Sequence, residues 1–135
     1  MERTQIRVIY GDTDQAGVVY YGNYLRFFEA SRNEFLRAKG LRYRDFEADY
    51  SMRLPVVEAQ VSYKQPARYD DLLTIEIWLA EVRRASARFE YRLLRGEELL
   101  ATGHTVHACV DLDGRVQRMP KELLARLSAG EQPST

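Results

Sequence analysis

The residues best suited to chemistry lie in one short run, residues 10–24. It holds two carboxylates, Asp12 and Asp14, and two glycines, Gly17 and Gly22, directly before a strongly amphipathic segment. A carboxylate can attack a carbonyl carbon or activate a water molecule, and unpaired N–H groups at a helix start can hold the resulting oxyanion. The run therefore predicts carbonyl chemistry that requires no metal, with Asp14 as the reacting group and Asp12 as the residue that shapes the loop.

A more ordinary interpretation of Asp14 stays open at this point. An aspartate in a glycine-containing loop before a helix is commonly a turn or cap residue. The glycines can likewise serve turn geometry alone, although they also let a substrate approach the backbone closely. The elements around the run, and the rest of the chain, have to decide between these interpretations.

A long helix is predicted directly after the run, from Asn23 to the Lys39-Gly40 pair. Gly40 suits the left-handed position that ends many helices. Polar residues fall largely on one side, and helical spacing on the other side is kept by Tyr24, Phe27, Phe28, Ser31, Phe35 and Ala38. This aromatic face needs a cover.

Strands supply that cover. The patterns predict strands near residues 6–10, 54–63, 72–82, 85–93 and 99–110, joined by short turns, and a closing helix from Pro120 to about Leu127. One strand, one helix and then consecutive strands favour an antiparallel sheet over parallel units. We predict an α+β fold with one domain at residues 1–127 and a flexible tail at residues 128–135.

Composition limits the function. The 135 residues are 45% hydrophobic, enough for one core, and 20 basic residues balance 20 acidic ones. This balance disfavours nucleic acid and acidic membrane surfaces as partners. A single cysteine, Cys109, excludes an internal disulfide, and no apolar run reaches the roughly 20 residues of a membrane span. We expect a cytoplasmic protein.

The sequence resembles a known family. Residues 12–24, Asp-Thr-Asp-Gln-Ala-Gly-Val-Val-Tyr-Tyr-Gly-Asn-Tyr, resemble the signature of the 4-hydroxybenzoyl-CoA thioesterase branch of the hotdog-fold acyl-CoA thioesterases. Residues 29–33, 69–76 and 81–84 are similar to that family in order and spacing. The resemblance implies a hotdog fold, in which a five-stranded antiparallel sheet wraps one long helix. It also implies a homodimer or homotetramer that pairs sheet to sheet, with active sites at the dimer interface and no cofactor.

The resemblance also implies roles for particular residues. The catalytic aspartate falls on Asp14, and the backbone N–H that polarises the thioester carbonyl falls on Tyr21, where related thioesterases of another branch have His. The substrate-binding residues that we expect are Gly17, Val18, Asn23, Arg83 and Arg84. The two arginines suit the phosphates of coenzyme A, although adjacent arginines can equally form a solvated turn. Lys64 and Arg118 are weaker phosphate candidates.

Other reactive side chains are assigned to structure. On a regular strand His104 and His107 face opposite sides of the sheet, which argues against a shared metal ion. Cys109 in an apolar strand is typical of a packed residue. We predict an acyl-CoA thioesterase for a small aryl or short- to medium-chain acyl group, with Asp14 as nucleophile or general base. The alternative is a non-catalytic hotdog protein that binds or scaffolds acyl-CoA or acyl carrier protein.

Overall fold

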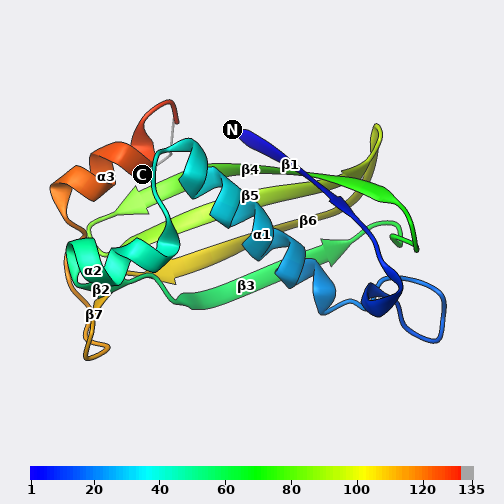
Figure 1. The fold of residues 1–135 in the computed structure, drawn as a ribbon, viewed down its shortest axis with the longest axis horizontal. Helices are drawn as coiled ribbons and strands as arrows, with labels where there is room; N and C mark the ends of the chain where they lie inside the picture. The colour runs from blue at the N-terminus through cyan, green and yellow to red at the C-terminus, as the bar shows by residue number, and fades with distance from the viewer. Residues whose placement is uncertain (132–135) are drawn as a thin grey trace.

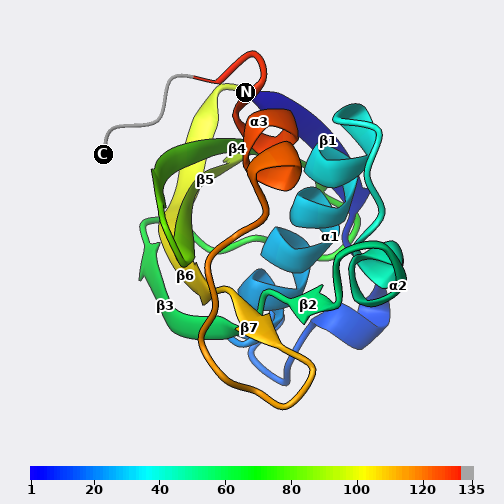
Figure 2. The same cartoon turned by 90° about the vertical axis from the view of Figure 1, so that its left-hand side faces the viewer.

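A curved antiparallel sheet wraps one long helix, as Figures 1 and 2 show. The computed structural model describes residues 1–131. The sheet has five strands in the order β1-β4-β5-β6-β3: β1 Glu2–Arg7, β4 Leu72–Arg83, β5 Ser86–Arg95, β6 Glu98–Ala108 and β3 Val56–Tyr63. Every neighbouring pair is antiparallel, so the predicted α+β architecture is confirmed.

Helix α1, Asn23–Ala38, lies across the inner face of the sheet (Figure 1). Its buried side is strongly aromatic because the apolar residues recur at helical spacing. Phe28 stacks on Tyr91 of β5 with ring centroids 4.2 Å apart, and Phe35 meets Phe89 edge-on at 5.2 Å. Burial of each of these side chains contributes roughly 1.5–3 kcal/mol, so this layer is the centre of the core.

Gly103 of β6 sets how closely the helix approaches the sheet. A Cβ atom at this position would lie 2.5 Å from the carbonyl oxygen of Gln60 and 2.6 Å from the Phe28 ring. No side chain fits into that space, so the ring of Phe28 lies over bare backbone. This contact helps to fix α1, and therefore the loop before it, against the sheet.

A small second layer closes one end of the molecule. It contains η2 (Tyr43–Asp45), α2 (Phe46–Tyr50), α3 (Lys121–Ser128) and a two-stranded sheet of β2 (Met52–Arg53) with β7 (Val110–Asp111). Phe46 and Met52 are fully buried, and Met52 contacts the buried Cys109 sulfur at 3.8 Å. Cys109 is thus a packed residue, and burial raises its pKa. The sequence analysis predicted α3 but no element within residues 41–53.

The two ends of the chain differ from the predictions. The first strand covers Glu2–Arg7 instead of residues 6–10, and Tyr10 begins the short helix η1 (Tyr10–Asp12). The tail that we predict at residues 128–135 begins within regular structure. Ser128 still belongs to α3, and the Glu131 carboxylate accepts hydrogen bonds from Lys39 and from the Leu79 amide. The remainder of that prediction, residues 132–135, lies outside the described residues.

Candidate active site

Asp12 is the structural hub of the signature loop. Its carboxylate is buried, accepts a 2.9 Å bond from the Ile9 amide and pairs with the Arg26 guanidinium on α1. Its carbonyl oxygen accepts bonds from the Tyr20 amide and from the Asn23 side chain, both at 2.9 Å. The predicted shaping role of Asp12 is visible in these contacts, which join both ends of the loop to the helix start. The Asn23 amide group, expected to bind substrate, serves this junction.

Asp14 has a different environment, because its side chain is exposed. One carboxylate oxygen accepts a 2.9 Å bond from the Ala16 amide, and the backbone closes a small loop through bonds from Asp14 N to Val18 O and from Gly17 N to Asp14 O. Gly17 has φ +82°, the left-handed geometry that this turn needs and that glycine adopts at low cost. Asp14 is therefore held in a fixed turn with its other carboxylate oxygen open to solvent.

Tyr21 lies at the other end of the loop, two residues before α1. Its carbonyl oxygen accepts a 2.9 Å bond from the hydroxyl of Tyr63, the last residue of β3. Within residues 1–131 the Tyr21 amide has no acceptor, so this donor is free at the helix start. Sequence reasoning missed Tyr63, because a tyrosine at the end of a strand carries no signal of such a long-range contact.

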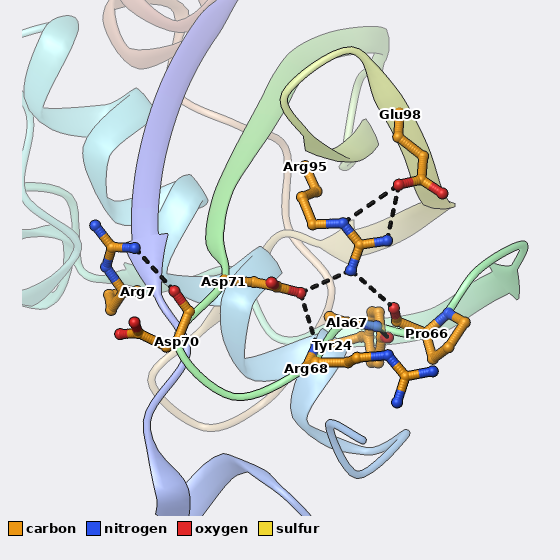
Figure 3. A network of polar contacts seen from close by, with 9 residues as sticks. All are labelled: Arg7, Tyr24, Pro66, Ala67, Arg68, Asp70, Asp71, Arg95 and Glu98. Carbon is orange, nitrogen blue, oxygen red and sulfur yellow. Dashed lines mark hydrogen bonds and ion pairs between the residues drawn. The ribbon is translucent and has the colours of Figure 1, made fainter. Parts of the chain in front are cut away.

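A polar network holds the segment before β4, residues 66–71, next to the signature loop (Figure 3). Val18 pairs with Arg68, and the Val19 amide donates to Ala67 O at 2.8 Å. Asp71 accepts a 2.8 Å bond from the Arg68 backbone amide and another from the Arg95 guanidinium. The network thus fixes residues 66–68, and these residues pair with Val18 and Val19 at the end of the Asp14 turn. The YDDLL sequence signalled a strand start, but its contact with the loop was not predicted.

The structure separates the predicted arginines from the signature loop. Arg83 and Arg84 lie at the turn between β4 and β5, whereas the loop lies near the start of β4, at Leu72. Eleven residues of extended strand span about 36 Å, and Figure 1 shows the two regions at opposite ends of the molecule. Arg83 pairs with Glu81, and both arginine side chains are exposed. Within one chain they do not join Asp14, Gly17, Val18, Tyr21 and Asn23.

A cavity of about 710 Å³ opens beside the second half of α1. Apolar residues from four elements form much of its wall, including Leu36, Leu54, Phe89 and Leu127. Charged groups also line it: Glu29, Arg32, Arg37, Arg42 and Arg44. A cavity that combines apolar walls with convergent polar groups is typical of a small-molecule site. The sequence analysis did not find it, because its residues come from distant parts of the chain.

A chain of hydrogen bonds runs behind this cavity. Arg32 donates to the Tyr91 hydroxyl at 3.0 Å, this hydroxyl contacts Thr105 Oγ1 at 2.6 Å, and Thr105 contacts His107 Nε2 at 2.9 Å. His107 Nδ1 lies 3.0 Å from Leu54 O. Burial lowers the pKa of His107, the bond to Leu54 O partly opposes this shift, and the positive charge of Arg32 adds to it; the net pKa is about 4, so the imidazole is neutral at neutral pH.

The direction of every bond in this chain follows from its two ends. The Leu54 carbonyl can only accept, so neutral His107 carries its proton on Nδ1 and accepts at Nε2 from the Thr105 hydroxyl. Tyr91 must then donate to Thr105, and its own oxygen accepts from the Arg32 guanidinium. Each bond in the chain thus has one defined donor and one defined acceptor, which makes the chain rigid.

The two histidines face opposite sides of the sheet, as predicted. His107 points inward to Leu54, whereas His104 bonds to Glu58 at 2.8 Å on the other face. Among residues 1–131, no group of three or more histidine, cysteine, aspartate and glutamate side chains is placed to hold a metal ion. No helix in the described part of the chain has the length and apolar character needed to cross a membrane.

Comparison with known proteins agrees with this geometry. The family model described as the thioesterase-like superfamily matches residues 8–127. The acyl-CoA thioesterase YbgC of Haemophilus influenzae is 38% identical over 122 residues, 89% of each chain. The 1,4-dihydroxy-2-naphthoyl-CoA hydrolase of Synechococcus elongatus is 37% identical over 116 residues, 84% of this chain and 85% of that protein.

The fold comparison leads to the same class. The crystal structure of the hypothetical protein TT1821 from Thermus thermophilus superposes with a TM-score of 0.90 at 36% identity, covering 96% of this chain and 98% of that one. The sheet wrapped on one helix is the hotdog fold, and the family model and relatives together identify the protein as a thioester hydrolase. The chain belongs to the thioesterase-like superfamily.

Proposed function

We propose that this protein hydrolyses the acyl-CoA thioester of a small aryl or short- to medium-chain acid. The observation that carries the proposal is the pairing of an exposed, fixed carboxylate, Asp14, with a free backbone donor, the Tyr21 amide, in one loop. The relatives named as acyl-CoA thioesterase and as 1,4-dihydroxy-2-naphthoyl-CoA hydrolase support coenzyme A as the thiol.

The chemistry needs only these two groups and water. The Tyr21 N–H donates to the thioester oxygen, and this interaction strengthens as the oxygen becomes an oxyanion. Asp14 either attacks the carbonyl carbon or removes a proton from a water molecule that attacks it. Collapse of the tetrahedral intermediate breaks the carbon–sulfur bond, and the thiolate leaves and takes a proton. In the nucleophilic route, water then hydrolyses the acyl-aspartyl anhydride.

We also propose that the working enzyme is a homodimer or a homotetramer. Among the described residues, β3 pairs with β6 on one side only, which leaves its other edge unpaired. Val57 in this edge strand is 62% exposed, and an open hydrophobic edge favours pairing with another strand. Pairing of two β3 edges joins two sheets and places Tyr63, the contact of Tyr21, beside the interface.

The proposal is tested by free-thiol release from benzoyl-, hydroxybenzoyl-, phenylacetyl-, short-chain and long-chain acyl-CoAs. We expect Asp14→Asn to lose most turnover while keeping its fold and assembly. Asp49→Asn is the matched control, because Asp49 is an exposed aspartate in the remote helix α2. Near-normal activity of a folded Asp14→Asn variant would contradict the proposal. Binding of acyl-CoA without turnover by the wild type would instead favour a scaffolding protein.

A single turnover in ¹⁸O-labelled water detects the nucleophilic route when water attacks the aspartyl carbonyl of the anhydride. Attack at the acyl carbonyl places the label in the product acid, as the general-base route does. Label found in the Asp14 carboxylate contradicts a purely general-base role, because a general base exchanges protons and not oxygen atoms. Mass spectrometry of the peptide that contains Asp14 provides this measurement. The Tyr21 donor is a backbone group, so substitution of its side chain tests packing and not oxyanion binding.

A further inference from the structure

The cavity beside α1 is lined by more arginine side chains than nearby carboxylates can pair with. Arg37 pairs with Glu34, and Arg42 pairs with Asp45. Within residues 1–131 no carboxylate pairs with Arg32 or with Arg44, and the cavity wall contains a single acidic residue, Glu29. Two unpaired guanidinium groups and one carboxylate leave an excess of hydrogen-bond donors and of positive charge at the wall.

Arg32 is the donor whose position is best fixed. One of its nitrogens, Nη1, is occupied by the Tyr91 hydroxyl, and the buried chain through Thr105 and His107 locks that hydroxyl in place. The only proton of the Tyr91 hydroxyl is donated to Thr105. The Tyr91 oxygen therefore accepts a hydrogen bond from Arg32 but carries no negative charge to balance the guanidinium. The remaining guanidinium N–H groups have no acceptor among the described residues, and a guanidinium offers five donors in a fixed plane.

The cavity and the catalytic loop meet across the proposed dimer. Val56, the first residue of β3, lines the cavity, and Tyr63, the last, contacts Tyr21. A two-fold axis pairs the two β3 edges antiparallel, so the Val56 end of one strand lies opposite the Tyr63 end of the other. This arrangement brings the cavity of one copy towards the Tyr21 amide of its partner, where the acyl group begins.

We propose that Arg32 is a specificity residue, which selects acyl groups that carry an oxygen acceptor, a carboxylate or a hydroxyl, at the end distant from the thioester. The inference rests on the proposed function, since it names the class of acyl group that the same enzyme takes. The hydrocarbon part of the acyl group packs against the apolar wall, and the Arg32 N–H groups donate hydrogen bonds to the distal oxygen. An acyl group without that oxygen leaves a desolvated guanidinium without a partner, which costs affinity.

The test compares substrates that differ only at the distal end: hexanoyl-CoA with adipoyl-CoA, which has a carboxylate in place of the terminal methyl, and benzoyl-CoA with 4-hydroxybenzoyl-CoA, which adds a hydroxyl. We expect the wild type to favour the oxygen-bearing member of each pair in kcat/KM, by on the order of 10- to 100-fold for the carboxylate. In Arg32→Met this ratio falls towards one. The ratio cancels any common loss of folded enzyme.

Two further variants sharpen the result. Arg88→Met removes one arginine from β5 outside the cavity, where Arg88 pairs with Glu90, and should keep the wild-type ratio. Tyr91→Phe removes the acceptor that holds Arg32 and should lower the ratio without removing any charge. A wild-type ratio near one, or an unchanged ratio in Arg32→Met, would overturn the inference.

Binding measurements keep the inference separate from the catalytic proposal. Titration calorimetry with two non-hydrolysable thioethers, S-hexyl-CoA and S-(5-carboxypentyl)-CoA, needs no turnover. If the wild type hydrolyses no acyl-CoA but binds the carboxylated thioether more tightly, in a manner that depends on Arg32, the catalytic proposal fails and the specificity role stands. Equal binding of both thioethers by a protein that does hydrolyse acyl-CoA contradicts the specificity role alone.

Discussion

Acidification should weaken the fold through one buried histidine. His107 is only 4% exposed, and burial is the main reason that its pKa falls to about 4 in the native protein. In the unfolded chain the same imidazole has a pKa near 6.5. Between these two values the unfolded state binds a proton and the native state does not. The free energy of unfolding therefore carries no penalty from His107 above about pH 6.5, and it decreases as the pH falls from 6.5 towards 4.

The expected size follows from the two pKa values. A difference of about 2.5 at about 1.4 kcal/mol per pKa unit is worth roughly 3 kcal/mol, nearly all of it lost at pH 4. At pH 5 the loss is about 2 kcal/mol by the same linkage. Protonation would also break the hydrogen-bond chain, because a charged His107 can no longer accept at Nε2 from Thr105.

Urea unfolding at pH 7, 5 and 4 measures this effect when the wild type is compared with His107→Gln. Glutamine is neutral throughout, and both proteins share the same carboxylates, so the difference between their pH profiles isolates the histidine. We expect the free energy of unfolding of the wild type to fall by about 2 kcal/mol more than that of the variant between pH 7 and pH 5. Parallel profiles, or an NMR titration of His107 with its midpoint above pH 6, would refute the reasoning.

Two further predictions concern the helix and the loop. Gly103→Ala should lower the free energy of unfolding in urea by about 1–3 kcal/mol, because the added Cβ would clash with Gln60 O and the Phe28 ring. The control is Gly11→Ala, whose added Cβ would have its nearest neighbour at 4.0 Å. Tyr63→Phe should lower kcat/KM about five-fold, because it removes the bond to Tyr21 O. An equal effect of Tyr69→Phe would show that the bond itself does not matter.

The sequence predicted the elements with strong periodicity and failed where tertiary contacts decide. Six buried residues of α1 keep helical spacing, so the helix was predicted with nearly its observed bounds. Residues 41–53 contain a short apolar pattern that includes Phe46 and Met52, whose burial depends on packing against the rest of the protein. The spacing of Tyr43, Phe46 and Tyr50 is helical, but one such turn is too short to predict η2 and α2, and β2 has only two residues.

The candidate site shows the same division. Asp14 and Tyr21 belong to one local motif, so their proximity in the loop follows from the chain itself. The contact between Tyr63 and Tyr21 spans 42 residues, and the wall of the cavity brings Glu29 together with Leu127. Such contacts depend on strand order and register. The sequence analysis supplied neither of these, and for the same reason it did not place Arg83 far from Asp14.

The strand order also has a consequence for synthesis of the chain. Among the described residues β1 pairs only with β4, and its Glu2 lies opposite Ile77. The central strands β4, β5 and β6 are joined by short turns and can pair as soon as each is made. A growing polypeptide therefore carries β1 without a sheet partner until β4 has left the ribosome. Strand β3 waits for a later element, because among the described residues it pairs only with β6, which is made after both β4 and β5.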